Sequence, residues 1–208
     1  MFIGKFNRTV IVTYLSIVAF LVGAYYSIFE GNIVAGIICL VVSGICDAFD
    51  GKIARMVKNR TDEDKAFGIQ IDSLSDIIAF GVLPAAIGYS VGLTEWWGKL
   101  IMAIFVLAAL IRLAYFNVME EQRQKKTDEV RKEYLGLPVT TDALIFPLVY
   151  ALKGFFHAKF YIFYAIMLVL IAFLFLYKFK VKKPNLKGMI IMTAVGIIEL
   201  LLLIWLMK

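Results

Sequence analysis

The sequence predicts an all-α polytopic membrane protein, a bundle of six to eight transmembrane helices. Hydrophobic residues make up 62% of its 208 residues, whereas a soluble domain is nearer half apolar. They also fall in long runs, and a run of about 18 or more apolar residues is typical of a membrane span. A soluble helical core would need amphipathic helices, but several of these segments are apolar on every side.

Seven segments are candidate spans. In chain order they are residues 9–28, 32–57, 68–91, 97–118, 139–154, 159–178 and 187–207. The first is not followed by the small-residue cleavage site of a signal peptide, so we interpret it as a retained span. The turns "FEGNI" and "LTEWWGK" end the first and third spans. The fifth is the weakest candidate, because it is short and contains Pro147, which disfavours a helix interior.

Basic residues predict the orientation of the bundle. With the amino terminus in the cytoplasm, four of the 22 Lys and Arg residues fall outside and the other 18 inside; the four are Lys99, Lys153, Lys159 and Lys208. This asymmetry predicts a multi-pass protein of the cell membrane with a cytoplasmic amino terminus. The net charge of +6 then reflects topology and attraction to anionic membrane lipid, and we expect no nucleic-acid partner.

The longest polar stretch is "MEEQRQKKTDEVRKEY", residues 119–134, in which charges of both signs alternate. Its helical pattern predicts a solvated cytoplasmic helix or a lid on the membrane surface. A role in gating a nearby site is the alternative.

Two pairs of aspartates stand near the cytoplasmic ends of neighbouring spans. Asp47 and Asp50 are three residues apart in the second span, and Asp72 and Asp76 are four apart in the third. Each spacing places both side chains on one helical face. Ionisable groups in spans are costly and mark functional sites. Because the two spans are antiparallel neighbours across one short loop, we expect all four carboxylates to converge.

Converging carboxylates repel one another unless some are protonated or cations lie between them. Oxygen ligands favour Mg²⁺, Mn²⁺ or Ca²⁺, while the lack of nearby Cys or His disfavours zinc. Small residues surround the acids: Gly44, Ala48, Gly51, Ala54 and Gly68. They allow either close helix packing or the approach of a ligand to the backbone.

Lys52 and Arg55 follow the first acid pair at the membrane surface. A guanidinium beside metal-bridged carboxylates suits a phosphate or pyrophosphate, although both residues could also be positive-inside anchors. The residues alone therefore predict a divalent-metal site that handles a phosphorylated substrate at the cytoplasmic interface.

Eight positions together resemble the signature of a known family, the integral-membrane CDP-alcohol phosphatidyltransferases. The pattern D-x2-D-G-x2-A-R, then G-x3-D-x3-D, is filled by Asp47, Asp50, Gly51, Ala54, Arg55, Gly68, Asp72 and Asp76. The loop between the halves is longer than is usual in the family, and we expect its acidic residues, Asp62, Glu63 and Asp64, to be solvated in the cytoplasmic turn.

Further motifs resemble the phosphatidylserine synthase branch of that family. They are "IDSLSDIIAFGVLPAA" (71–86), "RLAYFN" (112–117) and "GLP" (136–138). Tyr115 stands where the branch has an arginine. The other bacterial type of serine synthase uses paired His-Lys-Asp motifs, which one histidine in the chain excludes.

The resemblance implies transfer of a phosphatidyl group from CDP-diacylglycerol, or an archaeal ether analogue, to L-serine, giving phosphatidylserine and CMP. It implies one or two Mg²⁺ or Mn²⁺ ions held by Asp47, Asp50, Asp72 and Asp76, with Asp76 as general base in a direct displacement. Nucleotide and phosphate binding falls to Gly51, Ala54, Arg55 and Gly68. It also implies a homodimer. The sequence itself shows no repeat and no separate soluble domain, so we expect a single membrane domain, residues 1–208, with a catalytic core over about 1–180 and an additional span over about 187–207.

The serine carboxylate needs a receptor, and Arg112 is the candidate, because a guanidinium can bind a carboxylate with two hydrogen bonds. A snorkelling anchor is the alternative. Asn117, Thr140 and Thr141 could add hydrogen bonds to serine, and Asp142 could pair with Arg112 across the spans.

Three other functions stay open. The acceptor could be glycerol phosphate or inositol phosphate, which would need a second cluster of cations. A divalent-metal transporter would want acids near mid-membrane and an exit on the far side. A structural scaffold would leave the four aspartates unexplained.

Overall fold

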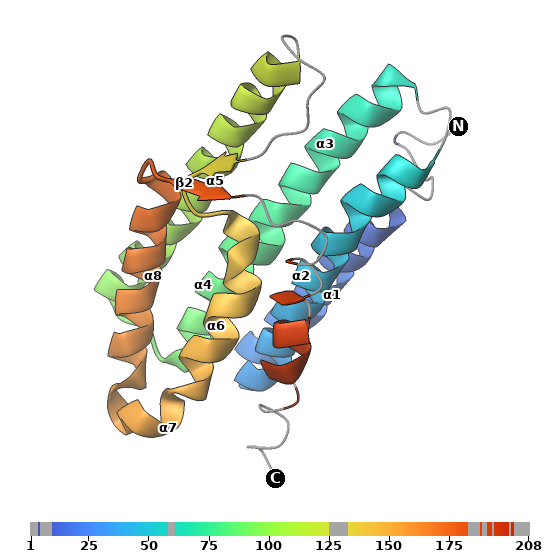
Figure 1. Cartoon of the computed structure of the whole chain (residues 1–208). Coiled ribbons are helices and arrows are strands. Elements are labelled where there is room, and N and C mark those ends of the chain that lie inside the picture. Colours follow the sequence, from blue (N-terminus) through green and yellow to red (C-terminus); the bar gives the residue numbers. More distant parts are fainter. Residues whose placement is uncertain are drawn as a thin grey trace.

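The computed structural model describes residues 4, 10–57, 61–124, 133–182, 188, 191–192, 194–199 and 201, without the side chains of residues 52, 54, 55 and 124. Long helices run back and forth through one bundle (Figure 1). The α-helices are α1 (Ile11–Ile28), α2 (Ile33–Met56), α3 (Asp62–Asp76), α4 (Leu83–Val91), α5 (Trp96–Gln124), α6 (Asp142–Ala151), α7 (Lys153–Phe156) and α8 (Phe160–Leu176). Between them lie the π-helix η1 (Ile77–Val82) and the 3-10 turns η2 (Val139–Thr141) and η3 (His157–Lys159).

Five helical segments are long and apolar enough to cross a membrane. They are Ile11–Ile28, Ile33–Gly51, Asp62–Val91, Trp96–Arg123 and Lys153–Leu176, with Val139–Ala151 as a shorter apolar helix. Large apolar side chains such as Leu107 and Phe173 lie exposed on the outside of the bundle, as lipid-facing residues do. The prediction of an all-α polytopic membrane protein is confirmed.

The third span begins earlier than the sequence predicted. Thr61 caps α3: its hydroxyl accepts from the Asp64 amide at 3.1 Å, and its own amide donates to the Asp64 carboxylate at 3.1 Å. This reciprocal pair is a capping box. Asp62, Glu63 and Asp64 therefore form the first helical turn, where negative charge favours the helix dipole. The prediction that they lie in a turn is wrong, although Asp62 and Glu63 are exposed as expected.

The third span also changes its winding midway. The π-helix η1 joins α3 to α4 directly after Asp76. Just beyond it, the carbonyl of Pro84 accepts a hydrogen bond from the hydroxyl of Tyr164 in α8 at 2.9 Å. π-helical turns within α-helices are rare and frequently occur at functional sites.

The core lies between the middle helices. Phe105 of α5 packs edge-on against Phe146 of α6, with ring centroids 5.9 Å apart, and Phe146 lies 5.2 Å from Tyr164 of α8. These rings are fully buried. Aromatic contacts of this kind hold α5, α6 and α8 together as one unit.

A short ribbon, absent from the predictions, ties distant parts of the chain together. Strand β1 (Glu133–Leu135) pairs antiparallel with β2 (Lys180–Lys182). The chain then turns at Gly136, whose positive φ of 73° suits glycine. In the segment 119–134, the residues up to Gln124 are helical and Glu133 and Tyr134 belong to a strand; residues 125–132 lie outside the described part.

The described residues of the last predicted span, 187–207, are helical. A Cβ atom at Gly196 would touch Leu144 of α6 and Val41 of α2, each at 3.4 Å. This helix therefore packs across α2 and α6, as its place in Figure 1 also shows.

Candidate functional site

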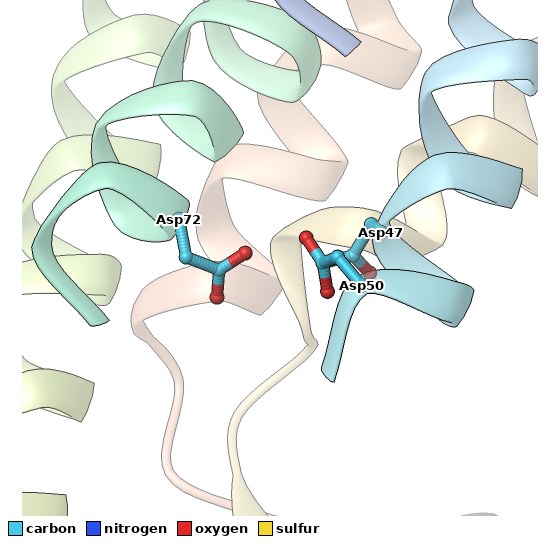
Figure 2. A group of neighbouring side chains, drawn as sticks. All are labelled: Asp47, Asp50 and Asp72. Carbon is cyan, nitrogen blue, oxygen red and sulfur yellow. The ribbon is translucent and has the colours of Figure 1, made fainter. Parts of the chain in front are cut away.

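Three carboxylates meet between α2 and α3. Asp47 and Asp50 project from α2 toward Asp72 of α3 (Figure 2). One oxygen from each of the three lies within 4.8 Å of the others. The predicted convergence of the two acid pairs is confirmed for these three residues.

A hydroxyl from α1 supports this triad. Thr13 donates a hydrogen bond from Oγ1 to Oδ2 of Asp50 at 3.2 Å, and the Thr13 carbonyl accepts one from Ser75 of α3 at 3.4 Å. The sequence analysis did not identify Thr13. The signal that could have identified Thr13 is a set of small and polar residues in an otherwise apolar helix. In the structure these residues are buried: Thr13, Ser16, Gly23 and Ser27.

The triad has the chemistry of a divalent-cation site. Its donors are carboxylate oxygens only, which Mg²⁺, Mn²⁺ and Ca²⁺ prefer. Oδ1 of Asp72 is buried and has no hydrogen-bond partner among the described residues. A buried, unpaired carboxylate oxygen is costly, and a cation at the triad would satisfy it. The residues present therefore fit a divalent metal ion.

The triad borders a cavity of about 510 Å³. Its polar lining includes Asp47, Asp72, Ser73, Asp76, Arg112, Thr140, Thr141 and Lys182. Its apolar lining includes Val41, Ile45, Leu144 and Met192. One cavity thus joins the acids of α2 and α3 to cations and hydroxyls from other elements, and it has an apolar side.

Asp76 lines this cavity one helical turn beyond Asp72, but it is not one of the three clustered carboxylates. The clustering does not support its predicted part as a metal ligand. Its predicted part as the general base stays a prediction, and its place on the cavity wall suits it.

Arg112 reaches the cavity from α5 and is held in place. Its side chain is buried, Nε donates to the Leu137 carbonyl at 3.0 Å, and the guanidinium carbon lies 5.0 Å from the Phe116 ring centroid. A snorkelling anchor would instead extend into water. The structure therefore favours the interpretation of Arg112 as a site residue.

The predicted pairing of Asp142 with Arg112 is wrong. Asp142 is fully buried at the start of α6, and neither carboxylate oxygen has a hydrogen-bond partner among the described residues. Its neighbours Thr141 and Ala143 line the cavity, whereas Asp142 does not. The guanidinium is instead tied to the Leu137 carbonyl.

Asn117 lies behind the cavity wall. Its Nδ2 donates to the Ser73 hydroxyl at 2.9 Å, and that hydroxyl donates to Oδ1 of Asn117 at 3.1 Å. Ser73 lines the cavity, but Asn117 does not. Thr140 and Thr141 do line it, and the Thr141 hydroxyl bonds to the Pro138 carbonyl at 2.5 Å. Asn117 thus supports the wall through Ser73.

The small residues divide into two groups. A Cβ atom at Gly51 would meet nothing within 4 Å, whereas one at Gly44 would collide with Cβ of Ala143. Gly51 and Ala48 therefore leave room at the cavity, and Gly44 also brings α2 close to α6. Gly68 does not line the cavity. The side chains of Ala54 and Arg55 lie outside the described residues.

Several known proteins are similar to this chain in sequence. The chain is 38% identical over 116 residues to the CDP-diacylglycerol–serine O-phosphatidyltransferase of Saccharomyces cerevisiae, covering 54% of this chain and 41% of that protein. The enzyme of that name from Helicobacter pylori is 34% identical over 123 residues, or 57% of this chain and 46% of that protein. The archaetidylserine synthase of Methanothermobacter thermautotrophicus is 29% identical over 166 residues, which are 79% of this chain and 64% of that protein.

This chain thus covers from 41% to 64% of the length of these three relatives. The likeness at the family level is broader. The sequence profile of the CDP-alcohol phosphatidyltransferases matches residues 6–207, which includes both acid pairs and the cavity. The chain therefore belongs to the CDP-alcohol phosphatidyltransferase family.

Proposed function

We propose that this protein transfers a phosphatidyl group from CDP-diacylglycerol, or from its ether-linked analogue, to the hydroxyl of L-serine. The products are phosphatidylserine and CMP. One observation carries the proposal: the carboxylates of Asp47, Asp72 and Asp76 share a cavity with the guanidinium of Arg112. The names of the serine phosphatidyltransferase and archaetidylserine synthase relatives support serine as the acceptor.

The acid triad is the proposed site of the donor substrate, CDP-diacylglycerol. Asp47, Asp50 and Asp72 would bind Mg²⁺ or Mn²⁺, which neutralises pyrophosphate charge and stabilises a departing phosphate. The open space beside Gly51 leaves room for the nucleotide next to the triad. The family resemblance also assigns a phosphate-binding role to Arg55, because a guanidinium suits a phosphate.

Asp76 acts on the acceptor. Its carboxylate takes the proton of the serine hydroxyl as the oxygen attacks the phosphorus that carries the lipid. A bond forms from that oxygen to phosphorus, and the bond from phosphorus to the CMP oxygen breaks. Ser73 lies between Asp72 and Asp76 in the sequence and on the same cavity wall, and its hydrogen bonds with Asn117 tie this wall to α5.

The lipid enters from the bilayer. The apolar lining of the cavity, from α2, α6 and the last helix, suits the start of the acyl or ether chains while the headgroup stays beside the aspartates. The excess of Lys and Arg at this end of the bundle supports a cytoplasmic active site in the cell membrane. Family resemblance supports a homodimer of one catalytic membrane domain.

CMP release tests the proposal. Purified protein receives CDP-diacylglycerol or its ether-linked analogue, Mg²⁺ or Mn²⁺, and one of three acceptors: L-serine, glycerol 3-phosphate or inositol 1-phosphate. We expect CMP and phosphatidylserine with serine only, and no release in excess EDTA. CMP release only with a phosphorylated acceptor would overturn the serine assignment, and no release with any acceptor would overturn the enzyme class.

A further inference from the structure

The cavity has a second cation that the eight-position signature does not contain. Lys182, the last residue of β2, lines it together with Val181 of the same strand and Tyr134 of β1. The β-ribbon, defined here as β1 and β2, is therefore part of the cavity wall. It brings residues 180–182 to a site whose acids come from α2 and α3.

The pairing of the ribbon leaves the Lys182 ammonium available. Lys182 lies directly opposite Glu133 in the strand register. The Glu133 carboxylate, however, pairs diagonally with Lys180, with Nζ and Oε2 3.1 Å apart. Among the described residues Lys182 forms no ion pair, and its side chain is exposed. Two lysines on one strand thus differ: Lys180 is paired with Glu133, and Lys182 lines the cavity.

The ribbon is fixed relative to Arg112. The Gly136 amide donates to the Phe179 carbonyl at 2.8 Å, and the Leu137 amide donates to the Leu174 carbonyl at 3.1 Å. The Leu137 carbonyl in turn accepts from Nε of Arg112 at 3.0 Å. Backbone bonds therefore connect the strand that carries Lys182 to the residue that orients Arg112.

Charge is divided across the cavity. Its acids come from α2 and α3, whereas its two described cations, Arg112 and Lys182, come from α5 and β2. A small acceptor with its hydroxyl at Asp76 would extend its anionic group toward the cations. Building on the function proposed above, we propose that Lys182 binds the carboxylate of the acceptor beside Arg112, and that the β-ribbon thereby selects the acceptor.

A matched pair of variants tests this inference. Lys182→Gln removes the charge of the lysine that lines the cavity, and Lys180→Gln removes the same charge two residues away on the same strand. With serine, Lys182→Gln should raise KM about tenfold, as the loss of a charge-assisted hydrogen bond predicts. The KM for CDP-diacylglycerol should not change. Lys180→Gln should behave as the wild type, and Lys182→Arg should recover most of the affinity for serine.

Serinamide, which lacks the carboxylate, provides the decisive comparison. Lys182→Gln should lower kcat/KM for serine but not for serinamide. Equal losses with both acceptors would place Lys182 at the donor phosphates and overturn the inference, as would an unchanged KM for serine. If the wild type instead used only glycerol 3-phosphate, both the proposed function and a carboxylate role for Lys182 would fail. Serine turnover with an unaffected Lys182→Gln variant would refute only the inference.

Discussion

Thr13 of α1 donates a hydrogen bond to Asp50 of α2 across 3.2 Å, so the first span is part of the support for the acid triad. Residues that orient metal ligands from behind affect affinity strongly, by about tenfold or more. We expect Thr13→Val to weaken Mn²⁺ binding about tenfold, measured by calorimetry or by the magnetic resonance of bound Mn²⁺.

Two controls accompany the Thr13 variant. Thr13→Ser keeps the hydroxyl and should bind Mn²⁺ nearly as the wild type does. Ser27→Ala removes a buried hydroxyl of the same helix that has no hydrogen-bond partner among the described residues, and it should leave Mn²⁺ binding unchanged. Equal weakening by Ser27→Ala would mean that α1 acts only through general packing.

The effect of an Asp72 substitution on thermal stability should change sign when a divalent cation is added. Without divalent cations, Asp72→Asn should match or exceed the wild type in thermal stability, because it removes one of three neighbouring charges. With Mg²⁺ at about 100 times its Kd, the wild type should gain about 2.7 kcal/mol, and the variant much less. Thermal unfolding in detergent measures both, with Asp62→Asn, on the exposed first turn of α3, as the control. Equal gains in wild type and variant would contradict a cation site at the triad.

Asp76 should affect turnover and leave binding intact. Asp76→Asn keeps the size of the side chain but removes the base, so kcat for CMP release should fall about 10²- to 10⁴-fold. CMP and Mn²⁺ should still bind, because Asp76 is outside the clustered triad. A variant that loses Mn²⁺ affinity in parallel with kcat would show that Asp76 is a ligand as well.

Gly44 and Gly51 allow the same substitution to separate packing from binding. Gly44→Ala places a Cβ against Ala143 and should destabilise the protein by about 1–3 kcal/mol, as overpacking does. Gly51→Ala meets nothing within 4 Å and should unfold like the wild type, but with a raised KM for CDP-diacylglycerol. A lowered melting temperature for Gly51→Ala, together with a raised KM for Gly44→Ala, would refute the assignment of packing to Gly44 and substrate binding to Gly51.

Long apolar runs were sufficient to predict the five long spans among the described residues, and helical periodicity was sufficient to predict the approach of three of the four aspartates. Residues three or four apart share a helical face, and a short loop makes two spans neighbours, so Asp47, Asp50 and Asp72 could be placed together before the structure. Arg112 was proposed as a site residue because it stands near the inner end of the predicted span 97–118, where a guanidinium can bind a carboxylate.

Contacts between distant segments were beyond this reasoning. The strands β1 and β2 are three residues each and lie some 45 positions apart, so no local pattern reveals their pairing. Lys182 therefore looked like one more interfacial lysine. The predictions for Asp142 and Asn117 failed for a related reason. The sequence shows which helix carries Arg112 and Asn117, but not that Arg112 bonds to the Leu137 carbonyl and Asn117 to the Ser73 hydroxyl.

The π-helix η1 allows one membrane span to serve two purposes. A π-helical turn holds one residue more than an α-helical turn, and one residue corresponds to about 100° of rotation. Before η1 the span presents Asp72 and Asp76 to the cavity; within and after it, Phe80 and Leu83 enter the core. The extra residue rotates the second half of the span relative to the first half. Deleting one residue within η1 would therefore turn either the aspartates away from substrate or the hydrophobic residues toward lipid.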